Sequence, residues 1–492
     1  MDQLSPQDAQ FLYMESEENH IQVTAVAIFD PSTVPGGKTV RFKDILAHIE
    51  SRLHMSPLFR RRLERVPFEL DFPYWVDDEH FDLEYHVQHS RLPKPGDWRQ
   101  LCIQLSRFHA RPLDMSQPLW EMLVIEGLDQ IDGLPEGAYA VATKLHHAGV
   151  DGASMTSFYR ALMDIDNKGT PAVPLNAVEA TRSPKPGIVD MTGRAVWNAV
   201  RSPIGMTDAV MRSAPALYRL AQQALKSQEK KPKLPVPDTR FNCRASPHKM
   251  FDATSVKLDD LKAIRKAVPG CTINDIVLSI CGGAVRRYLQ HHIELPKESL
   301  VAWVPINARS GPIEDDDHPG NRITAMTTRI FTDVEDAVER LQLIHKSTQK
   351  SKAAKSGISA RLMTDLSQHV PSATLVTAGR LVLRAGMAAR VCNLFISNVP
   401  GPQVPLYMNG AQQVATYGIA PLVDGMGLFI ATPSYNGNIT FNVTSTRETL
   451  PDIHFFIECI EKSLDELRKA TTKPKAAKKR AKKSTPKRRN SA

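Results

Sequence analysis

The sequence predicts an α/β protein whose helices and strands fall into two mixed halves. Residues 1–175 alternate helical and strand patterns, and residues 240–470 resume the same mixture. Between them, residues 226–238 are charged and proline-rich, a composition typical of a solvated linker. A chain of 492 residues is long enough for two or more domains.

Individual elements follow from the spacing of apolar residues. The pattern from Phe42 to Leu53 predicts a helix, and that from Gly137 to Leu145 predicts a strand. Prolines and serines then indicate a loop, an amphipathic helix begins near Val189, and another apolar helix is predicted from Asn274 to Leu289. We therefore divide the chain into an N-terminal domain at 1–180, a crossover linker at 181–239, a C-terminal domain at 240–470 and a tail at 471–492.

The net charge of +9 comes from the tail. Residues 471–492 contain ten Lys or Arg and no Asp or Glu, and without these ten the chain has 52 basic and 53 acidic residues. Because the tail has no large apolar residue to bury, we expect it to be disordered. An anionic membrane or lipid-droplet surface is the partner we favour for it. Nucleic acid binding through phosphates, or a solubilising role alone, are the alternatives.

Cysteine usage and hydropathy indicate a cytoplasmic protein that meets lipid only at its surface. The six cysteines lie too far apart for the close pairs of zinc ribbons, so we expect buried reduced thiols. The opening residues are too polar and acidic for a signal peptide. No run of 18 apolar residues occurs that could span a bilayer.

Two adjacent histidines, His146 and His147, carry the strongest chemical signal. They follow the predicted strand at 137–145 and begin HHAGVDG, an HHxxxDG pattern that leads into a helical pattern. Histidine suits proton transfer because its ordinary pKa, near 6.5, leaves much of the ring neutral at pH 7. A packed histidine pair followed by a turn is the structural alternative. The pair His291–His292 lacks the Asp-Gly and is expected to be solvent-exposed.

Other common chemistries lack their motifs. The chain has neither a G-x-S-x-G nucleophile elbow nor an H-E-x-x-H zinc helix. The stretch from Gly36 to Thr39 imitates a phosphate loop, but Ser32 stands where that loop needs glycine. A G-x-G-x-x-G beginning at Gly425 is broken by Ile430. Direct group transfer by a histidine base, with no metal, therefore remains.

The motif HHAGVDG at 146–152 resembles the active-site signature of the coenzyme A-dependent acyltransferases, which include chloramphenicol acetyltransferases and peptide-synthetase condensation domains. Further segments resemble the bacterial wax ester synthase/diacylglycerol acyltransferase family, in order from about residue 4 to 465. These are LSPQDAQFLYME at 4–15, SPLFRRRL at 56–63, PLW at 118–120, ND at 274–275, GN at 320–321 and NVPGP at 398–402.

The resemblance implies two chloramphenicol acetyltransferase-like domains with mixed sheets and an active-site tunnel between them. It makes His147 the general base, with no covalent intermediate, and His146 a supporting residue. It pairs Asp151 with an arginine that holds the loop, for which Arg60 is our first candidate and Arg62 our second. Gly152 is then a position of close backbone approach. No cofactor is implied, since acyl-CoA is a substrate.

Two further positions have open roles. Asn274 either donates a hydrogen bond to the oxyanion or the alcohol, or caps the helix that follows. Asp275 fits the helix dipole equally well. Trp120 is expected in the core, with a place on the acyl channel as the alternative.

The predicted function is transfer of a fatty acyl group from acyl-CoA to diacylglycerol, a long-chain alcohol, or both. The products would be triacylglycerol and wax ester, and the sequence does not choose between the acceptors. One alternative is a condensation-type enzyme that takes its acyl group from a carrier protein. A non-enzymatic alternative is a lipid-droplet or nucleoid-associated protein that keeps the fold, although such a protein has no need of the histidine base.

Overall fold

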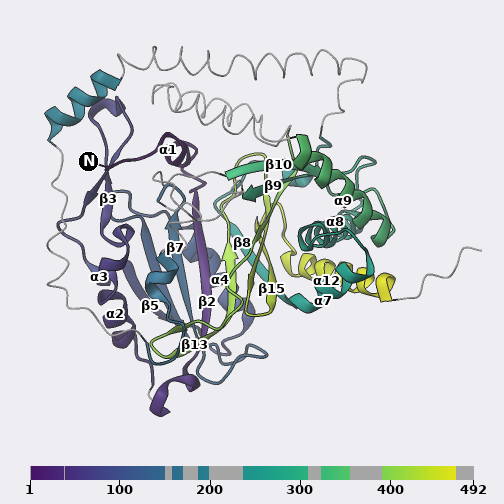
Figure 1. The fold of residues 1–492 in the computed structure, drawn as a ribbon, viewed down its shortest axis with the longest axis horizontal. Coiled ribbons are helices and arrows are strands. Elements are labelled where there is room, and N and C mark those ends of the chain that lie inside the picture. Colours follow the sequence, from purple (N-terminus) through teal and green to yellow (C-terminus); the bar gives the residue numbers. More distant parts are fainter. Residues whose placement is uncertain are drawn as a thin grey trace, which may run out of the picture.

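The computed structural model describes most of the chain in seven ranges. These are residues 2–37, 39–149, 158–169, 187–198, 236–307, 323–354 and 391–472. Two six-stranded sheets stand side by side at the centre, and helices cover their outer sides (Figure 1). The fold is therefore mixed α/β with mixed sheets, as the sequence predicts. Among the described residues, no helix has the length and apolar character needed to cross a bilayer.

The first sheet has the strand order β12-β13-β2-β7-β6-β5. Its strands are β12 (Tyr407–Met408), β13 (Ala411–Ile419), β2 (Gln22–Asp30), β7 (Tyr139–His146), β6 (Trp120–Glu126) and β5 (Val87–Arg91). Only β5 and β6 run parallel; the other neighbours are antiparallel. The predicted strand at 137–145 is thus confirmed as β7. Every residue of β7 is buried, because the strand is central and covered on both faces.

Helices pack on each face of the first sheet. Helix α2 (Phe42–Glu50) and the short helix α3 (Leu83–His86) lie on the outer face. Helix α2 confirms most of the helix predicted over residues 42–53. On the inner face lies α4 (Trp98–Ala110), which begins with a capping box. The carboxylate of Asp97 accepts the backbone N–H of Gln100, and the Gln100 side chain accepts the N–H of Asp97 in return.

A small third sheet has the order β1-β4-β3. Its strands are β1 (Asp2–Gln3), β4 (Tyr74–Asp77) and β3 (Arg61–Glu64). Directly after β1 comes α1 (Pro6–Tyr13), which Ser5 caps by accepting the backbone N–H of Asp8. Pro6 at the first helical position loses no hydrogen bond there. The small sheet and α1 lie beside the end of β7 (Figure 1).

The second sheet has the order β10-β9-β11-β14-β15-β8. Its strands are β10 (Ile323–Arg329), β9 (Val301–Asn307), β11 (Leu394–Val399), β14 (Leu428–Tyr435), β15 (Asn438–Thr446) and β8 (Lys249–Lys257). Its helices are α7 (Leu258–Ala267), α8 (Ile273–His291), α9 (Ala337–Ala354) and α12 (Ile453–Thr472). All four gather on the face that points away from the first sheet (Figure 1). The largest apolar core of the described chain fills the space between them and the sheet.

Two features join the halves. Strand β13, although late in the sequence, pairs antiparallel with β2 and so belongs to the first sheet. Helix α4 packs against β8 of the second sheet, where Trp98 donates a hydrogen bond of 2.8 Å from Nε1 to Asp252. The core beneath α4 combines residues from both halves, including Phe251 and Ile419. The division of the chain at residues 180 and 239 stays a prediction.

The linker is described only at 187–198, where residues 188–198 are helical, near the predicted start at Val189. This helix packs on the segment before β4, because Met191 and Ala195 form a small core with Val66 and Tyr74. The linker residues 199–235 and the tail after Thr472 lie outside the described residues.

Candidate active site

The end of β7 places the two histidines of the motif. The backbone N–H of His146 donates to the carbonyl of Leu119, which precedes β6, at 3.0 Å. The backbone N–H of His147 donates to the carbonyl of Ile21, which precedes β2, at 2.9 Å. Because the neighbouring strands bind consecutive residues from opposite sides, the backbone of the histidine pair is rigidly held.

The ring of His147 lies in an apolar environment. Phe11 of α1 stacks on it, with ring centroids 4.2 Å apart and planes inclined by 28°. His147 keeps a small exposed surface, but protein surrounds most of it. This burial lowers the pKa of His147 to about 4; hydrogen bonding to its own backbone opposes the shift, and the nearby His146 reinforces it. The ring is therefore neutral at pH 7 and can accept a proton.

The position of the His147 ring also indicates which nitrogen can react. Its Nδ1 is buried and has no well-formed hydrogen bond to another residue in the described parts of the chain. Because Nδ1 is enclosed, we expect Nε2 to be the nitrogen that meets a substrate.

The second histidine ring, that of His146, is oriented by contacts at both nitrogens. The backbone N–H of Ala148 donates to its Nδ1 at 3.0 Å, so the ring proton belongs on Nε2. That Nε2 lies 3.0 Å from Oε1 of Glu15, although the contact is not aligned as a hydrogen bond. Glu15 Oε1 also accepts the backbone N–H of Ile21 at 2.8 Å. His146 is almost fully buried, so it orients the motif and is not open to a substrate.

The charge of Glu15 is kept despite its surroundings. Burial alone would raise its pKa, but the contacts with His146 and the Ile21 backbone outweigh burial and lower it. Sequence reasoning missed both Glu15 and Phe11 as parts of the site. The segment that contains them was quoted for its resemblance only, and nothing in the local pattern shows a contact with a strand 130 residues away.

Behind the histidines lies a buried polar cluster. Lys144, two residues before His146, is fully buried and pairs across strands with Glu121 at 2.9 Å. Its Nζ also donates to the carbonyls of Phe108 and Arg111 at the end of α4. His109 is buried there too, and burial together with nearby lysines lowers its pKa to about 3. These contacts fix the end of α4 against β7.

The second half of the motif lies outside the described residues, which end at Gly149 and resume at Phe158. The predicted roles of Asp151 and Gly152, and the pair of Asp151 with Arg60, stay predictions. Gly149 faces Leu58 and Trp75, so the segment that carries Arg60 lies near the motif. A cavity of about 10 Å³ separates them.

Asn274 is the second residue of α8 and is half-buried. The alternative that it caps this helix is wrong, because Thr272 is the cap. The Thr272 hydroxyl accepts the backbone N–H of Asp275, and the Asp275 carboxylate accepts that of Thr272. Asp275 also accepts hydrogen bonds from Thr348 and His345 of α9, so it joins two helices. The T-x-x-D spacing could have identified this capping box. Asn274 itself makes no side-chain hydrogen bond with the described residues.

Other predicted residues prove structural. Trp120 is buried in the core of the first sheet and donates from Nε1 to the Phe59 carbonyl at 3.0 Å. His291 is exposed as predicted, but the exposure predicted for His292 is wrong. His292 is half-buried against Tyr288, and its Nε2 lies 3.1 Å from Asp452. Among the described residues, no group of three or more His, Cys, Asp or Glu could hold a metal ion.

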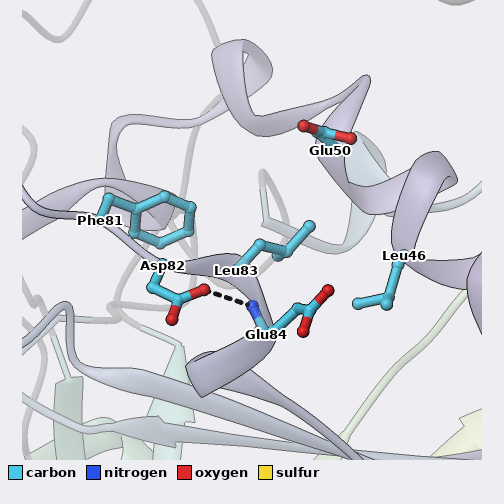
Figure 2. Close-up of a pocket in the computed structure, with 6 residues that line it drawn as sticks. All are labelled: Leu46, Glu50, Phe81, Asp82, Leu83 and Glu84. Atoms are coloured by element: carbon cyan, nitrogen blue, oxygen red, sulfur yellow. Dashed lines mark hydrogen bonds between the residues drawn. The ribbon is translucent and has the colours of Figure 1, made fainter.

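A hollow of about 340 Å³ opens elsewhere on the first half, between α2 and α3 (Figure 2). It is lined by Leu46, Glu50, Phe81, Asp82, Leu83 and Glu84. The Asp82 carboxylate accepts the backbone N–H of Glu84 at 3.0 Å and so caps α3. None of the predicted site residues lines this hollow, and we assign it no function.

The comparison with known proteins agrees with this geometry. The model of the wax ester synthase/diacylglycerol acyltransferase catalytic domain matches residues 4–277, and that of the C-terminal domain matches residues 319–468. A putative diacylglycerol O-acyltransferase of Mycobacterium tuberculosis is 34% identical over 475 residues, which cover 95% of this chain and 99% of that protein. The O-acyltransferase WSD of Acinetobacter baylyi is 30% identical over 473 residues, which cover 94% and 96%.

Solved structures lead to the same family. The wax ester synthase/diacylglycerol acyltransferase from Marinobacter aquaeolei VT8 matches with a TM-score of 0.66 and 27% identity, covering 95% of this chain and 99% of that one. The first condensation domain of the calcium-dependent antibiotic synthetase shares the fold, with a TM-score of 0.54, 13% identity and 96% of each chain covered. The chain is an acyltransferase and belongs to the wax ester synthase/diacylglycerol acyltransferase family.

Proposed function

We propose that this acyltransferase moves a fatty acyl group from acyl-CoA to the hydroxyl of diacylglycerol, a long-chain alcohol, or both. The observation that carries the proposal is the state of His147. It is a neutral, largely buried ring at the rigid end of β7, with one nitrogen left for a substrate. The names of the related proteins, which include diacylglycerol O-acyltransferases and a wax ester synthase, support this choice of acceptors.

The proposed reaction is a direct transfer. The Nε2 of His147 accepts the proton of the acceptor hydroxyl while that oxygen attacks the thioester carbonyl carbon. The carbon–sulfur bond then breaks, and the departing thiolate takes the proton from His147, which gives an ester and free coenzyme A. A stacked Phe11 limits the access of water to the base, so hydrolysis of the thioester is disfavoured.

Asn274 is our candidate for stabilising the oxyanion that forms on the carbonyl oxygen. Its amide is half-buried at the start of α8 and is not engaged by another described side chain or carbonyl. A single donor of this kind typically contributes about 10²–10³ in rate. The helix N-terminus adds a favourable partial positive charge.

The test is an assay of the purified protein with radiolabelled palmitoyl-CoA and either dipalmitoylglycerol or hexadecanol. We expect labelled triacylglycerol, wax ester or both, with release of one free coenzyme A thiol for each ester. If palmitoyl-CoA gives neither product while a palmitoyl-loaded carrier protein does, the condensation-type alternative replaces this proposal. Loss of label to free palmitate alone would also contradict it.

We further propose that the enzyme works at an anionic membrane or lipid-droplet surface. Its proposed acceptors and products are water-insoluble, and the ten basic residues of 471–492 would be attracted to anionic lipid. The helix at 188–198 adds an apolar outer side. Val189 is 84% exposed and Trp197 is 55% exposed, on the side opposite the packed Met191 and Ala195. This helix lies at one edge of the molecule (Figure 1).

A further inference from the structure

Three aromatic side chains form a row across the second sheet. Trp303 of β9, Phe395 of β11 and Phe429 of β14 occupy the same level of three neighbouring strands. The ring centroids of Trp303 and Phe395 are 4.9 Å apart, with planes at 84°. Those of Phe395 and Phe429 are 5.2 Å apart, with planes at 24°. With strands spaced by about 4.8 Å, the row spans about 10 Å.

The row projects from the face of the second sheet opposite to the one that α7, α8, α9 and α12 cover. Neighbours of the three rings along their strands point the opposite way and are buried in the helix-covered core. These neighbours are Ala302, Val304, Leu394, Ile396, Leu428 and Ile430. The rings therefore point to the side of the first sheet. All three are only half-buried, although large aromatic residues on central strands are ordinarily covered.

One end of the row adjoins the catalytic histidine. Trp303 and Phe395 pack against a small core whose buried members include Ile21 and Met426. Phe11 packs against the same core and also stacks on the ring of His147. The Ile21 carbonyl accepts the backbone N–H of His147. The apolar surface is thus continuous from the base to the first ring of the row.

The other end of the row is closed. Beyond Phe429 the same level of the sheet continues through Thr444 of β15 to Phe251 of β8. Both residues are buried, Phe251 in the core beneath α4. The half-buried aromatic surface therefore ends at β14.

We propose that the row Trp303–Phe395–Phe429 binds the hydrocarbon chain of the acyl-CoA donor, with the thioester near His147 and the methyl end toward Phe429. This inference rests on the proposed function and deepens it. The family name covers two kinds of acceptor, a long-chain alcohol and diacylglycerol. The acyl chain of the donor is the hydrocarbon chain that takes part in both reactions. A single row of rings fits that one chain, whereas diacylglycerol carries two.

The position of each ring sets the expected result of truncating it. Trp303 packs against the same small core as Phe11, which stacks on His147, so we expect an acyl chain of any length to contact it, whereas only longer chains should reach Phe429. We expect Phe429→Ala to lower the ratio of kcat/KM for palmitoyl-CoA to that for octanoyl-CoA by about tenfold. Trp303→Ala should lower kcat/KM for both donors by similar factors. The matched control is Phe455→Ala, which removes a half-buried ring from α12 on the opposite side of the sheet and should leave the ratio unchanged.

Varying the acceptor distinguishes the two sources of a hydrocarbon chain. With octanoyl-CoA fixed as donor, wild-type and Phe429→Ala enzymes should respond alike to decanol and hexadecanol. If the variant instead loses its preference among alcohols and keeps its preference among donors, the row holds the acceptor and the proposal is overturned. If Phe429→Ala does not fold, Phe429→Leu, which keeps an apolar side chain but removes the ring, should show a smaller change of the same sign.

Calorimetric titration with palmitoyl-CoA and octanoyl-CoA separates this inference from the proposed function. Phe429→Ala should weaken palmitoyl-CoA binding by about tenfold and octanoyl-CoA binding by less. A protein that binds in this way but forms no ester would contradict the proposed function and leave the row supported. An enzyme that forms esters with donor preference and donor binding unaffected by Phe429→Ala would contradict the row alone.

Discussion

The carboxylate of Glu15 and the ring of His146 meet at 3.0 Å, although 131 positions separate them in the sequence. Glu15 lies just after α1, so this contact links the end of that helix to β7, the strand that leads into the HHxxxDG motif. Phe11 of the same helix covers His147. Helix α1 therefore contacts both histidines, and we expect Glu15 to act on the reaction through His146.

Glu15→Ala should lower kcat by about 10- to 100-fold with little change in KM, because a small displacement of the base costs that much. Glu15→Gln should restore part of the rate, since its amide oxygen can still accept the backbone N–H of Ile21 and contact the His146 ring. Steady-state kinetics with palmitoyl-CoA provide the measurement. The control is Glu18→Gln at a surface ion pair with Arg244. Equal loss in Glu15→Ala and Glu15→Gln would contradict a positioning role.

His147→Ala should reduce turnover to less than a tenth of the wild-type kcat while the protein still folds. The ring contributes a proton acceptor worth about 10²–10⁴ in rate. His146→Ala should cost less, because it orients the motif and does not meet the substrate. Circular dichroism and thermal melting establish folding in each variant. Turnover above a tenth of wild type in a folded His147→Ala protein would rule out the base.

The pKa of about 4 for His147 predicts an unusual pH profile. The base works when neutral, and a pKa lowered from 6.5 keeps it neutral as the pH falls from 7 to 5. Initial rates on saturating donor should therefore stay nearly constant across that range. An acid limb in kcat/KM with a midpoint near 6.5 would show that the reactive ring is more solvated than the structure indicates.

The same shifts predict a loss of stability in acid. His109 and His147 have folded-state pKa values of about 3 and 4, both below the unfolded value near 6.5. Below pH 6.5 the unfolded chain thus binds more protons than the folded one, so the free energy of unfolding falls as the pH falls. Each histidine contributes about 1.4 kcal/mol per pH unit until its folded pKa is reached. Calorimetric Tm values at pH 7.5, 6 and 5 should decrease, and His109→Gln should flatten the decrease.

Local patterns predicted what is local in this fold. The strand before the motif, the helix from Phe42 and the helix at 274–289 all follow from apolar spacing, and the structure confirms them. The pairing of β13 with β2 does not follow from spacing, because neighbours in a sheet are chosen by the whole chain. For the same reason Glu15, Phe11 and the aromatic row were missed. The N-terminal cap of α8 could have been predicted from the sequence, since Thr272 and Asp275 have the spacing of a capping box.

Asp151 is predicted to pair with Arg60, and Leu58 of the same segment lines a small cavity together with Gly149. The Nε of Arg60 is buried and has no hydrogen-bond partner in the described ranges, so a nearby carboxylate would satisfy it. Asp151→Asn should then destabilise the protein by about 3–5 kcal/mol, as well as lower activity. Chemical denaturation measures the change. The double variant Asp151→Asn/Arg60→Met should recover part of the stability, and strict additivity of the two single variants would contradict the pair.

The tail at 471–492 is predicted to hold the enzyme at anionic lipid through its ten basic residues. Each contributes about 1 kcal/mol near an anionic bilayer, and screening by salt reduces this. Deleting residues 473–492 should therefore weaken sedimentation with phosphatidylserine vesicles, and most strongly at low salt. Turnover on detergent-dispersed substrate should stay unchanged.

The apolar outer side of the helix at 188–198 should act differently from the tail. Trp197→Ser removes a ring that is 55% exposed, so it should weaken binding equally at low and high salt. A variant that lacks residues 473–492 and also carries Trp197→Ser should not sediment with the vesicles. The matched control is Val391→Ser, another exposed apolar residue, which comes just before β11 of the second sheet and should sediment like wild type. If vesicle binding is the same with and without the tail at every salt concentration, the tail has no membrane role, and the 188–198 helix alone would have to account for any binding that remains.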